Sequence, residues 1–197
     1  MSVAKATKVL LIERDQAKAK VVLEALDCSS YDVKHLSCIG ISLLKEIDHA
    51  EPDLILMDVE SPSRDVIENL NYISQLNPKP VVMFSEDEDQ NTISELVKSG
   101  VSAYVIGDVN AERVRSVISV AIARFQEFQQ LKNELKQTKN LLNGQKVINK
   151  AKTWLMTKKQ LSEEQAYHRM RKMAMDNGQK VEEVAKNILS IASVLED

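Results

Sequence analysis

The chain has 197 residues, of which 44% are hydrophobic and 28% are charged, with only 5 Gly and 4 Pro. This composition is typical of a globular protein and excludes a disordered chain. The net charge is −3, and no apolar run approaches the ~18 residues that a membrane span requires, so we expect a cytoplasmic protein that does not enter a membrane.

Short apolar runs alternate with longer amphipathic stretches over the first 125 residues. Near-continuous apolar runs indicate strands that are buried on both faces, as in a parallel sheet covered by helices on each side. The alternation predicts βαβ units and an α/β doubly wound sheet. The predicted strands are 8–12, 54–57, 81–84 and 103–106, with a further one near Tyr31 to His35.

Acidic residues, a serine and a glycine directly follow several of these predicted strands. Glu13 and Asp15 come after the first strand, Asp58 after the third, Ser85 after the fourth and Gly107 after the fifth. In a doubly wound sheet the loops diverge at the carboxyl ends of the strands, and ligand sites form there. We therefore expect the acidic side chains and the hydroxyl to meet at one site.

The sequence from Val114 onward predicts helices. No Pro occurs after Val114, and Gly144 is the only Gly before Gly178, so a long helix followed by shorter ones is expected. Apolar residues recur at spacings of three and four, as in a coiled coil. They would either form the seam of a dimer or pack on the neighbouring domain; they are Ala121, Phe125, Phe128, Leu131, Leu135 and Leu142.

The end of the chain predicts a compact helical unit. Ser162 with Gln165 three residues later is a capping-box pattern, which predicts that a helix begins here. Asn177 and Gly178 predict its end. A last helix follows, with an apolar stripe from Val181 to Ala192.

The N-terminal part of the chain is acidic, whereas a segment of the C-terminal part is strongly basic. Residues 1–125 carry 13 basic and 20 acidic side chains, a net charge of −7, whereas residues 128–175 carry 11 basic and 3 acidic side chains, a net charge of +8. A concentrated basic segment indicates a protein that binds a polyanion, although such a segment also occurs as an ordinary solvated helix face.

Residues 6–125 resemble the receiver domain of bacterial two-component response regulators. The resemblance rests on Asp58 in LILMDVESP, on Ser85 in VVMFSED and on the segment GVSAYVI. It implies that Asp58 is the phosphoacceptor and Ser85 the switch hydroxyl. It also implies that a weakly held Mg²⁺ is bound by Glu13, Asp15, Asp58 and Glu60.

Two positions depart from the receiver pattern. Arg14 stands where the family has the second acid, and Gly107 stands where it has a lysine. A guanidinium removes a ligand and adds positive charge, and loss of the lysine removes a cation that pairs with an acyl phosphate. We therefore expect a degenerate site controlled mainly by a partner protein, with ordinary phosphorylation by a histidine kinase as the alternative.

Residues 132–195 resemble the ANTAR module, an RNA-binding antitermination domain. The matching segments are KVINKAKTWLM, SEEQAYHRMRKMAMDN and VEEVAKNIL. The resemblance implies binding to tandem stem-loops in leader transcripts, by a homodimer with two helical heads. The residues expected to contact RNA are Lys150, Lys152, Lys158, Lys159, Tyr167, Arg169, Arg171 and Lys172.

The whole chain is similar to the NasT type of nitrate-assimilation regulator, which implies a nitrate-sensing partner protein. The predicted architecture is a receiver-like, flavodoxin-like domain (1–125), a coiled-coil helical linker (126–145) and a small three-helix ANTAR domain (146–197). We find no catalytic motif and expect no enzyme. The alternative functions are a DNA-binding two-component response regulator and a protein that binds only other proteins.

Overall fold

The computed structural model describes residues 6–26, 30–37, 43–107, 109 and 111–195. It divides into two compact units, Met1–Gln129 and Gln130–Asp197. No helix among the described residues is long and apolar enough to cross a membrane.

The first unit contains a five-stranded parallel sheet. Its strands are β1 (Thr7–Ile12), β2 (Tyr31–Leu36), β3 (Leu54–Asp58), β4 (Val81–Ser85) and β5 (Ala103–Ile106). Their order is β2-β1-β3-β4-β5. The predicted doubly wound sheet is therefore confirmed.

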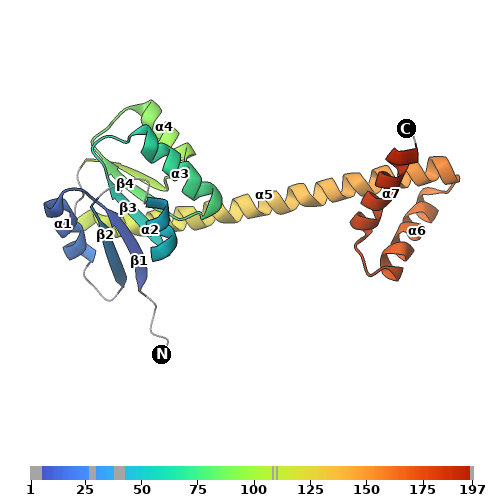
Figure 1. The fold of residues 1–197 in the computed structure, drawn as a ribbon, viewed down its shortest axis with the longest axis horizontal. Helices are drawn as coiled ribbons and strands as arrows, with labels where there is room; N and C mark the ends of the chain where they lie inside the picture. Colours follow the sequence, from blue (N-terminus) through green and yellow to red (C-terminus); the bar gives the residue numbers. More distant parts are fainter. Residues whose placement is uncertain (1–5, 27–29, 38–42, 108, 110, 196–197) are drawn as a thin grey trace. The chain divides into compact units, whose positions relative to one another are not determined.

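Helices cover both faces of this sheet (Figure 1). They are α1 (Gln16–Leu26), α2 (Leu43–Ala50), α3 (Arg64–Leu76), α4 (Gln90–Lys98) and the first part of α5 (Ala111–Lys159). Alternate strand residues point to opposite faces: Leu10 and Ile12 pack with α2, α3 and α4, whereas Val9 and Leu11 pack with α1 and α5. Both layers are apolar because both faces of the strands are covered.

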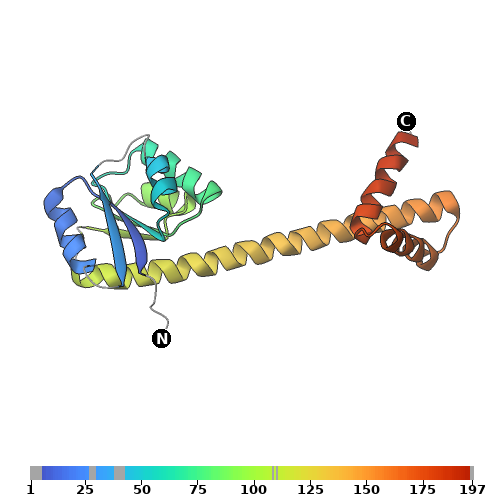
Figure 2. The ribbon, with the colours of Figure 1, turned by 60° about the horizontal axis from the view of Figure 1, so that its bottom comes forward.

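The second unit is made by the end of α5 with α6 (Glu163–Asp176) and α7 (Val181–Leu195) (Figure 2). Small and flexible side chains let these short helices approach closely. The buried residues of this core are Ala151, Leu155, Ala166, Met170, Ala174, Val184, Ala185 and Ile188.

The predicted boundaries of α6 are confirmed. The Ser162 hydroxyl accepts a hydrogen bond from the backbone N–H of Gln165, and the Gln165 side chain accepts one from the backbone N–H of Ser162. Asn177 is the C-terminal cap, and Gly178 follows with a φ of +63°. The turn before α6 contains Gln160 at a φ of +49°, a conformation that a side chain makes costly.

Helix α5 has 49 residues and uses different faces along its length. Val114, Ile118 and Ala121 are buried in the core of the first unit, and Ala151 and Leu155 in that of the second. Every residue from 130 to 143 is exposed. Of the predicted coiled-coil stripe, Ala121 thus packs within its own domain, whereas the apolar residues from Phe128 onward do not.

Candidate functional site

Asp58 lines a cavity at the carboxyl edge of the sheet. β1 and β3 are neighbours, but α1 follows β1 on one face and α3 follows β3 on the other, so their loops diverge at this point. The cavity has a volume of about 870 Å³. Its charged lining residues are Glu13, Arg14, Asp15, Lys18, Asp58, Glu60, Asp65 and Glu68.

The two acidic side chains after β1 accept hydrogen bonds from nearby backbone N–H groups. The Glu13 side chain is buried, and its Oε1 accepts a hydrogen bond from the backbone N–H of Asp15 at 2.7 Å. Asp15 Oδ1 accepts from the backbone N–H groups of Ala17 at 2.7 Å and Lys18 at 3.3 Å, and so caps the first turn of α1. Asp15 therefore has a structural role that its position in the sequence did not reveal.

Two of the residues that line the cavity, Glu13 and Asp58, have buried carboxylate oxygens. Glu13 Oε2 and Asp58 Oδ2 are buried and accept no hydrogen bond, although Asp58 does interact with its surroundings. Six carboxylates against two cations line the cavity, which favours a cation there. Within the described part of the chain, however, no group of three or more His, Cys, Asp or Glu side chains is arranged to hold a metal ion.

Ser85 lies at the end of β4 and is 1% exposed. Its hydroxyl donates a hydrogen bond to the backbone carbonyl of Glu60 at 3.0 Å and accepts one from the backbone N–H of Asp87. It therefore links the loop after β3 to the loop after β4. The Tyr104 hydroxyl donates to the carbonyl of Asp87 at 2.6 Å and holds the same loop.

Lys18 was not expected in the site. It is half-buried in the first turn of α1 and lines the cavity with Asp58. Gly107, where the resemblance implies a lysine, has a φ of +94°, a conformation that favours glycine. The sequence does not predict Lys18 as a site residue, because its immediate neighbours match no motif. Lys18 lines the cavity because α1 begins directly after the loop that follows β1.

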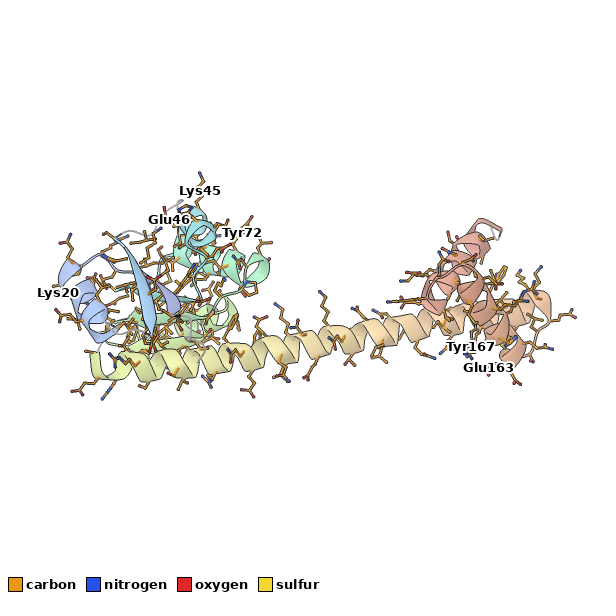
Figure 3. All side chains as sticks on the ribbon, turned by 90° about the horizontal axis from the view of Figure 1, so that it is seen from below. Lys20, Lys45, Glu46, Tyr72, Glu163 and Tyr167 are labelled. Atoms are coloured by element: carbon orange, nitrogen blue, oxygen red, sulfur yellow. The ribbon has the colours of Figure 1, made fainter. Side chains whose placement is uncertain are left out.

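The predicted RNA contacts on α6 lie on more than one face. Tyr167 and Arg171 are four residues apart and therefore neighbours on one exposed face, on which Tyr167 is 44% exposed. Arg169 lies about 160° around the helix from Arg171. Tyr167 and Glu163, one turn before it, can be followed in Figure 3.

The predicted RNA-binding lysines of α5 also lie on more than one face of their helix. Lys150 is exposed, but Lys152, two residues later, is only 17% exposed and forms an ion pair with Glu163 at 2.6 Å. This pair joins the end of α5 to the start of α6, and the Lys152 ammonium lowers the pKa of Glu163 from its ordinary value by hydrogen bonding and by charge. Lys158 and Lys159 end α5 and are exposed.

Two family models match the chain. The response regulator receiver domain model matches residues 9–119, which is more than half of the chain. The chain belongs to this family. The ANTAR domain model matches residues 136–189. The chain therefore combines a receiver domain with an ANTAR domain, and both are domains of regulators.

Relatives with similar sequences are also regulators. The transcriptional regulatory protein PdtaR of Mycobacterium tuberculosis is 25% identical over 189 residues, which cover 95% of this chain and 92% of the relative. A nitrate regulatory protein of Klebsiella oxytoca is 43% identical over 68 residues, which cover 34% of this chain and 17% of that protein. The similarity to PdtaR thus extends over both domains.

Solved receiver structures share the fold of the first unit. The signal receiver domain of a LuxO repressor protein from Vibrio parahaemolyticus aligns with a TM-score of 0.54 at 20% identity, covering 64% of this chain and 97% of that chain. A CheY-like receiver domain from Methanospirillum hungatei also aligns with a TM-score of 0.54, at 20% identity, covering 62% and 98%. These similarities concern the fold alone.

Proposed function

We propose that this receiver–ANTAR protein is an RNA-binding transcription antitermination regulator that acts on hairpins in leader transcripts. The observation that carries the proposal is the exposed face of α6, where Tyr167 stands one turn from Arg171 in the unit that matches the ANTAR domain. An aromatic ring next to a guanidinium is suited to unpaired loop bases, which stack on both kinds of plane.

The physical role of the small core is to present this face. Ala166, Met170 and Ala174 bury the adjacent side of α6, which lies about 60–100° around the helix from Tyr167 and Arg171, so the exposed side keeps a fixed direction. Cations nearby attract RNA phosphates and release condensed counterions, which makes the affinity depend on salt. Holding one hairpin in a leader transcript prevents a competing terminator hairpin from forming, and this is the activity we assign.

The test is an affinity measurement with tandem stem-loop RNA and, in parallel, duplex DNA of the same length, at several salt concentrations. We expect a preference for the hairpin RNA. Replacing Tyr167 with Ala removes a stacking surface, which costs about 1–3 kcal/mol per base. Equal affinity for both nucleic acids would overturn the proposal, and a preference for duplex DNA would favour a DNA-binding response regulator instead.

A matched pair of variants tests the proposed face. Arg171→Ala and Arg169→Ala remove the same charge from opposite sides of α6. We expect Arg171→Ala to weaken RNA binding and to reduce the slope of log affinity against log salt by about 1, with a smaller effect for Arg169→Ala. If the two variants bind equally, Tyr167 and Arg171 do not form the contact face.

We assign control of this activity to the receiver domain, with a partner protein as the main signal. A Mg²⁺ ion would be held weakly by Glu13, Asp15, Asp58 and Glu60, the predicted ligands, all of which line the cavity, because Asp15 Oδ1 also caps α1. Such an ion neutralises charge during phosphoryl transfer. The chain itself contributes the Asp58 acceptor and the Ser85 hydroxyl.

Incubation with acetyl phosphate and Mg²⁺ separates the two kinds of control. We expect substoichiometric labelling of Asp58 and little change in RNA affinity, with Asp58→Asn as the unlabelled control. Stoichiometric, Asp58-dependent labelling that changes RNA affinity would assign control to a histidine kinase.

We further propose that the target genes serve nitrate or nitrite assimilation and that the partner senses nitrate. Support comes from the similarity to a nitrate regulatory protein, which is limited to 68 residues. The test is to isolate the chain with its bound proteins and transcripts from cells with and without nitrate. Nitrate should release the partner and increase the amount of bound leader RNA.

The active form that we propose is a homodimer, because two heads can hold two stem-loops at once and so raise the overall affinity. The exposed apolar side chains of α5 are its proposed contact. Sedimentation of the full chain over a range of concentrations, with and without RNA, tests this.

A further inference from the structure

The cavity at Asp58 is lined by more negative than positive side chains, and its two cations come from one short segment. Six carboxylates line it, with Arg14 and Lys18 as the cations. The Glu13 side chain is buried, and nothing in the described part of the chain donates a hydrogen bond to its Oε2. Buried negative charge of this kind requires a positive charge nearby. Lys18 is the better placed of the two cations, because it is half-buried whereas Arg14 is exposed.

The geometry of α1 directs the Lys18 side chain to the edge of the sheet where Asp58 lies. Lys18 stands one turn before Val22, which is buried in the core against the sheet. Residues four apart share one face of a helix, so the Lys18 side chain begins on the sheet side of α1. Helical side chains lean toward the N-terminus of their helix. The N-terminus of α1 follows the loop after β1, at the carboxyl edge of the sheet.

A lysine in the first turn of a helix is unfavourable for the helix itself. The N-terminus of a helix carries a partial positive charge, which favours acidic side chains and repels cations. Helix α1 has no acidic residue in its first turn, and Asp15, just before it, is the capping residue. The other negative charges that can offset the Lys18 ammonium are those of the cavity. The position of Lys18 is therefore explained by the cavity and not by the helix.

We infer that the Lys18 ammonium is a built-in counter-ion of the Asp58 cavity, which compensates the charge of its carboxylates and competes with Mg²⁺ for them. The inference rests on the proposed weak Mg²⁺ site and adds the residue that weakens it. A divalent ion in the cavity would lie near a positive charge that belongs to the chain, and the two repel each other. The cavity is thus compensated without an ion, which suits control by a partner protein.

Titration of the full chain with Mn²⁺ tests this competition. Mn²⁺ takes the same oxygen ligands as Mg²⁺, and electron paramagnetic resonance measures the ion that stays free. Lys18→Met keeps the length of the side chain but removes its charge, and should tighten Mn²⁺ binding by about tenfold or more. Lys18→Glu should bind Mn²⁺ more tightly still, and Lys18→Arg should bind it as weakly as the unchanged chain. The affinity should therefore follow the charge at position 18.

Lys20→Met is the matched control on the same helix. Lys20 lies about 160° around α1 from Lys18. It is exposed, is labelled in Figure 3 and pairs with Glu24 at 3.8 Å. The substitution removes the same charge, but solvent and salt screen an exposed charge at this distance, so Mn²⁺ affinity should not change. If Lys20→Met tightens Mn²⁺ binding as much as Lys18→Met does, the effect belongs to net charge and the inference is wrong.

Thermal unfolding of the same variants gives a second measurement. Without a metal ion, Lys18→Met should lower the unfolding midpoint, because the carboxylates of the cavity lose their counter-ion. Excess Mn²⁺ should then raise the midpoint of Lys18→Met more than that of the unchanged chain, because a ligand stabilises a folded protein more when it binds more tightly. An equal response to Mn²⁺ in both proteins would mean that Lys18 only supports the fold, and would overturn the inference.

The outcomes separate this inference from the proposed function. If the unchanged chain and Lys18→Met bind Mn²⁺ equally weakly, the inference is overturned and the proposed weak site stands. Tight binding by the unchanged chain, or no binding by any variant, overturns the inference together with the proposed weak site. Hairpin preference is measured on the same proteins, and its absence in a chain whose Mn²⁺ affinity follows the charge at position 18 overturns the RNA proposal alone.

Discussion

The capping box at Ser162 gives a way to separate folding of the ANTAR unit from RNA contact. Ser162→Ala removes the acceptor of the 3.2 Å hydrogen bond from Gln165 N–H, and with it one of the two reciprocal bonds that start α6. Loss of an N-cap costs about 1 kcal/mol. In a unit of 60–100 residues that loss lowers the unfolding midpoint by roughly 4–8 °C.

The assay is thermal unfolding of the full chain, followed by RNA affinity at 25 °C. Ser162 is not on the proposed contact face, and a loss of about 1 kcal/mol leaves a unit of ordinary stability folded, so RNA affinity should be unchanged. Ser162→Asp, which supplies another capping acceptor, should restore the midpoint. A variant that keeps its midpoint, or that loses RNA affinity as Tyr167→Ala does, would refute this reasoning.

Three further changes probe the same unit. Gln160→Gly relieves the positive φ of the turn before α6 and should raise stability in urea unfolding by about 1 kcal/mol; no gain would mean that the turn is not strained. Met170→Ala empties a fully buried position and should cost about 2–5 kcal/mol in the same assay. The Lys152 ammonium lowers the pKa of Glu163, so their pair stabilises the fold above the ordinary glutamate pKa of about 4.3 and loses this effect as pH falls through the lowered value. Glu163→Gln should therefore differ from the unchanged protein at neutral pH and converge with it in acid; a constant difference would assign the effect to packing.

Local signals in the sequence predicted the elements well. The four apolar runs became β1, β3, β4 and β5, because a strand covered on both faces leaves little choice of residue, and the further strand predicted near Tyr31 became β2. Ser162 with Gln165 predicted the start of α6 because a capping box is made by residues close together in the chain. The cavity at Asp58 was predictable for a related reason, since strand ends in a doubly wound sheet meet by topology.

Roles that depend on three-dimensional neighbours were not predictable. Asp15 is predicted as a metal ligand, and the sequence pattern does not show that its Oδ1 also caps α1. Lys150 and Lys152 were counted together as basic residues, yet they lie on different sides of α5, and Lys152 pairs with Glu163. Counting charges along a segment ignores the 3.6-residue helical repeat, which decides the face on which each charge lies.

The hydrogen bonds around Asp58 bear on how the receiver domain is controlled. Ser85 already joins the loop after β3 to the loop after β4, through Glu60 and Asp87, so a phosphoryl group at Asp58 would have to compete with these contacts. Gly107 offers no cation to hold that group. A ligand shifts a two-state equilibrium only by the difference in its affinity for the two states. Because a protein surface makes many more contacts than one phosphoryl group, a bound partner can supply the larger difference, and acetyl phosphate without the partner should leave RNA affinity nearly unchanged.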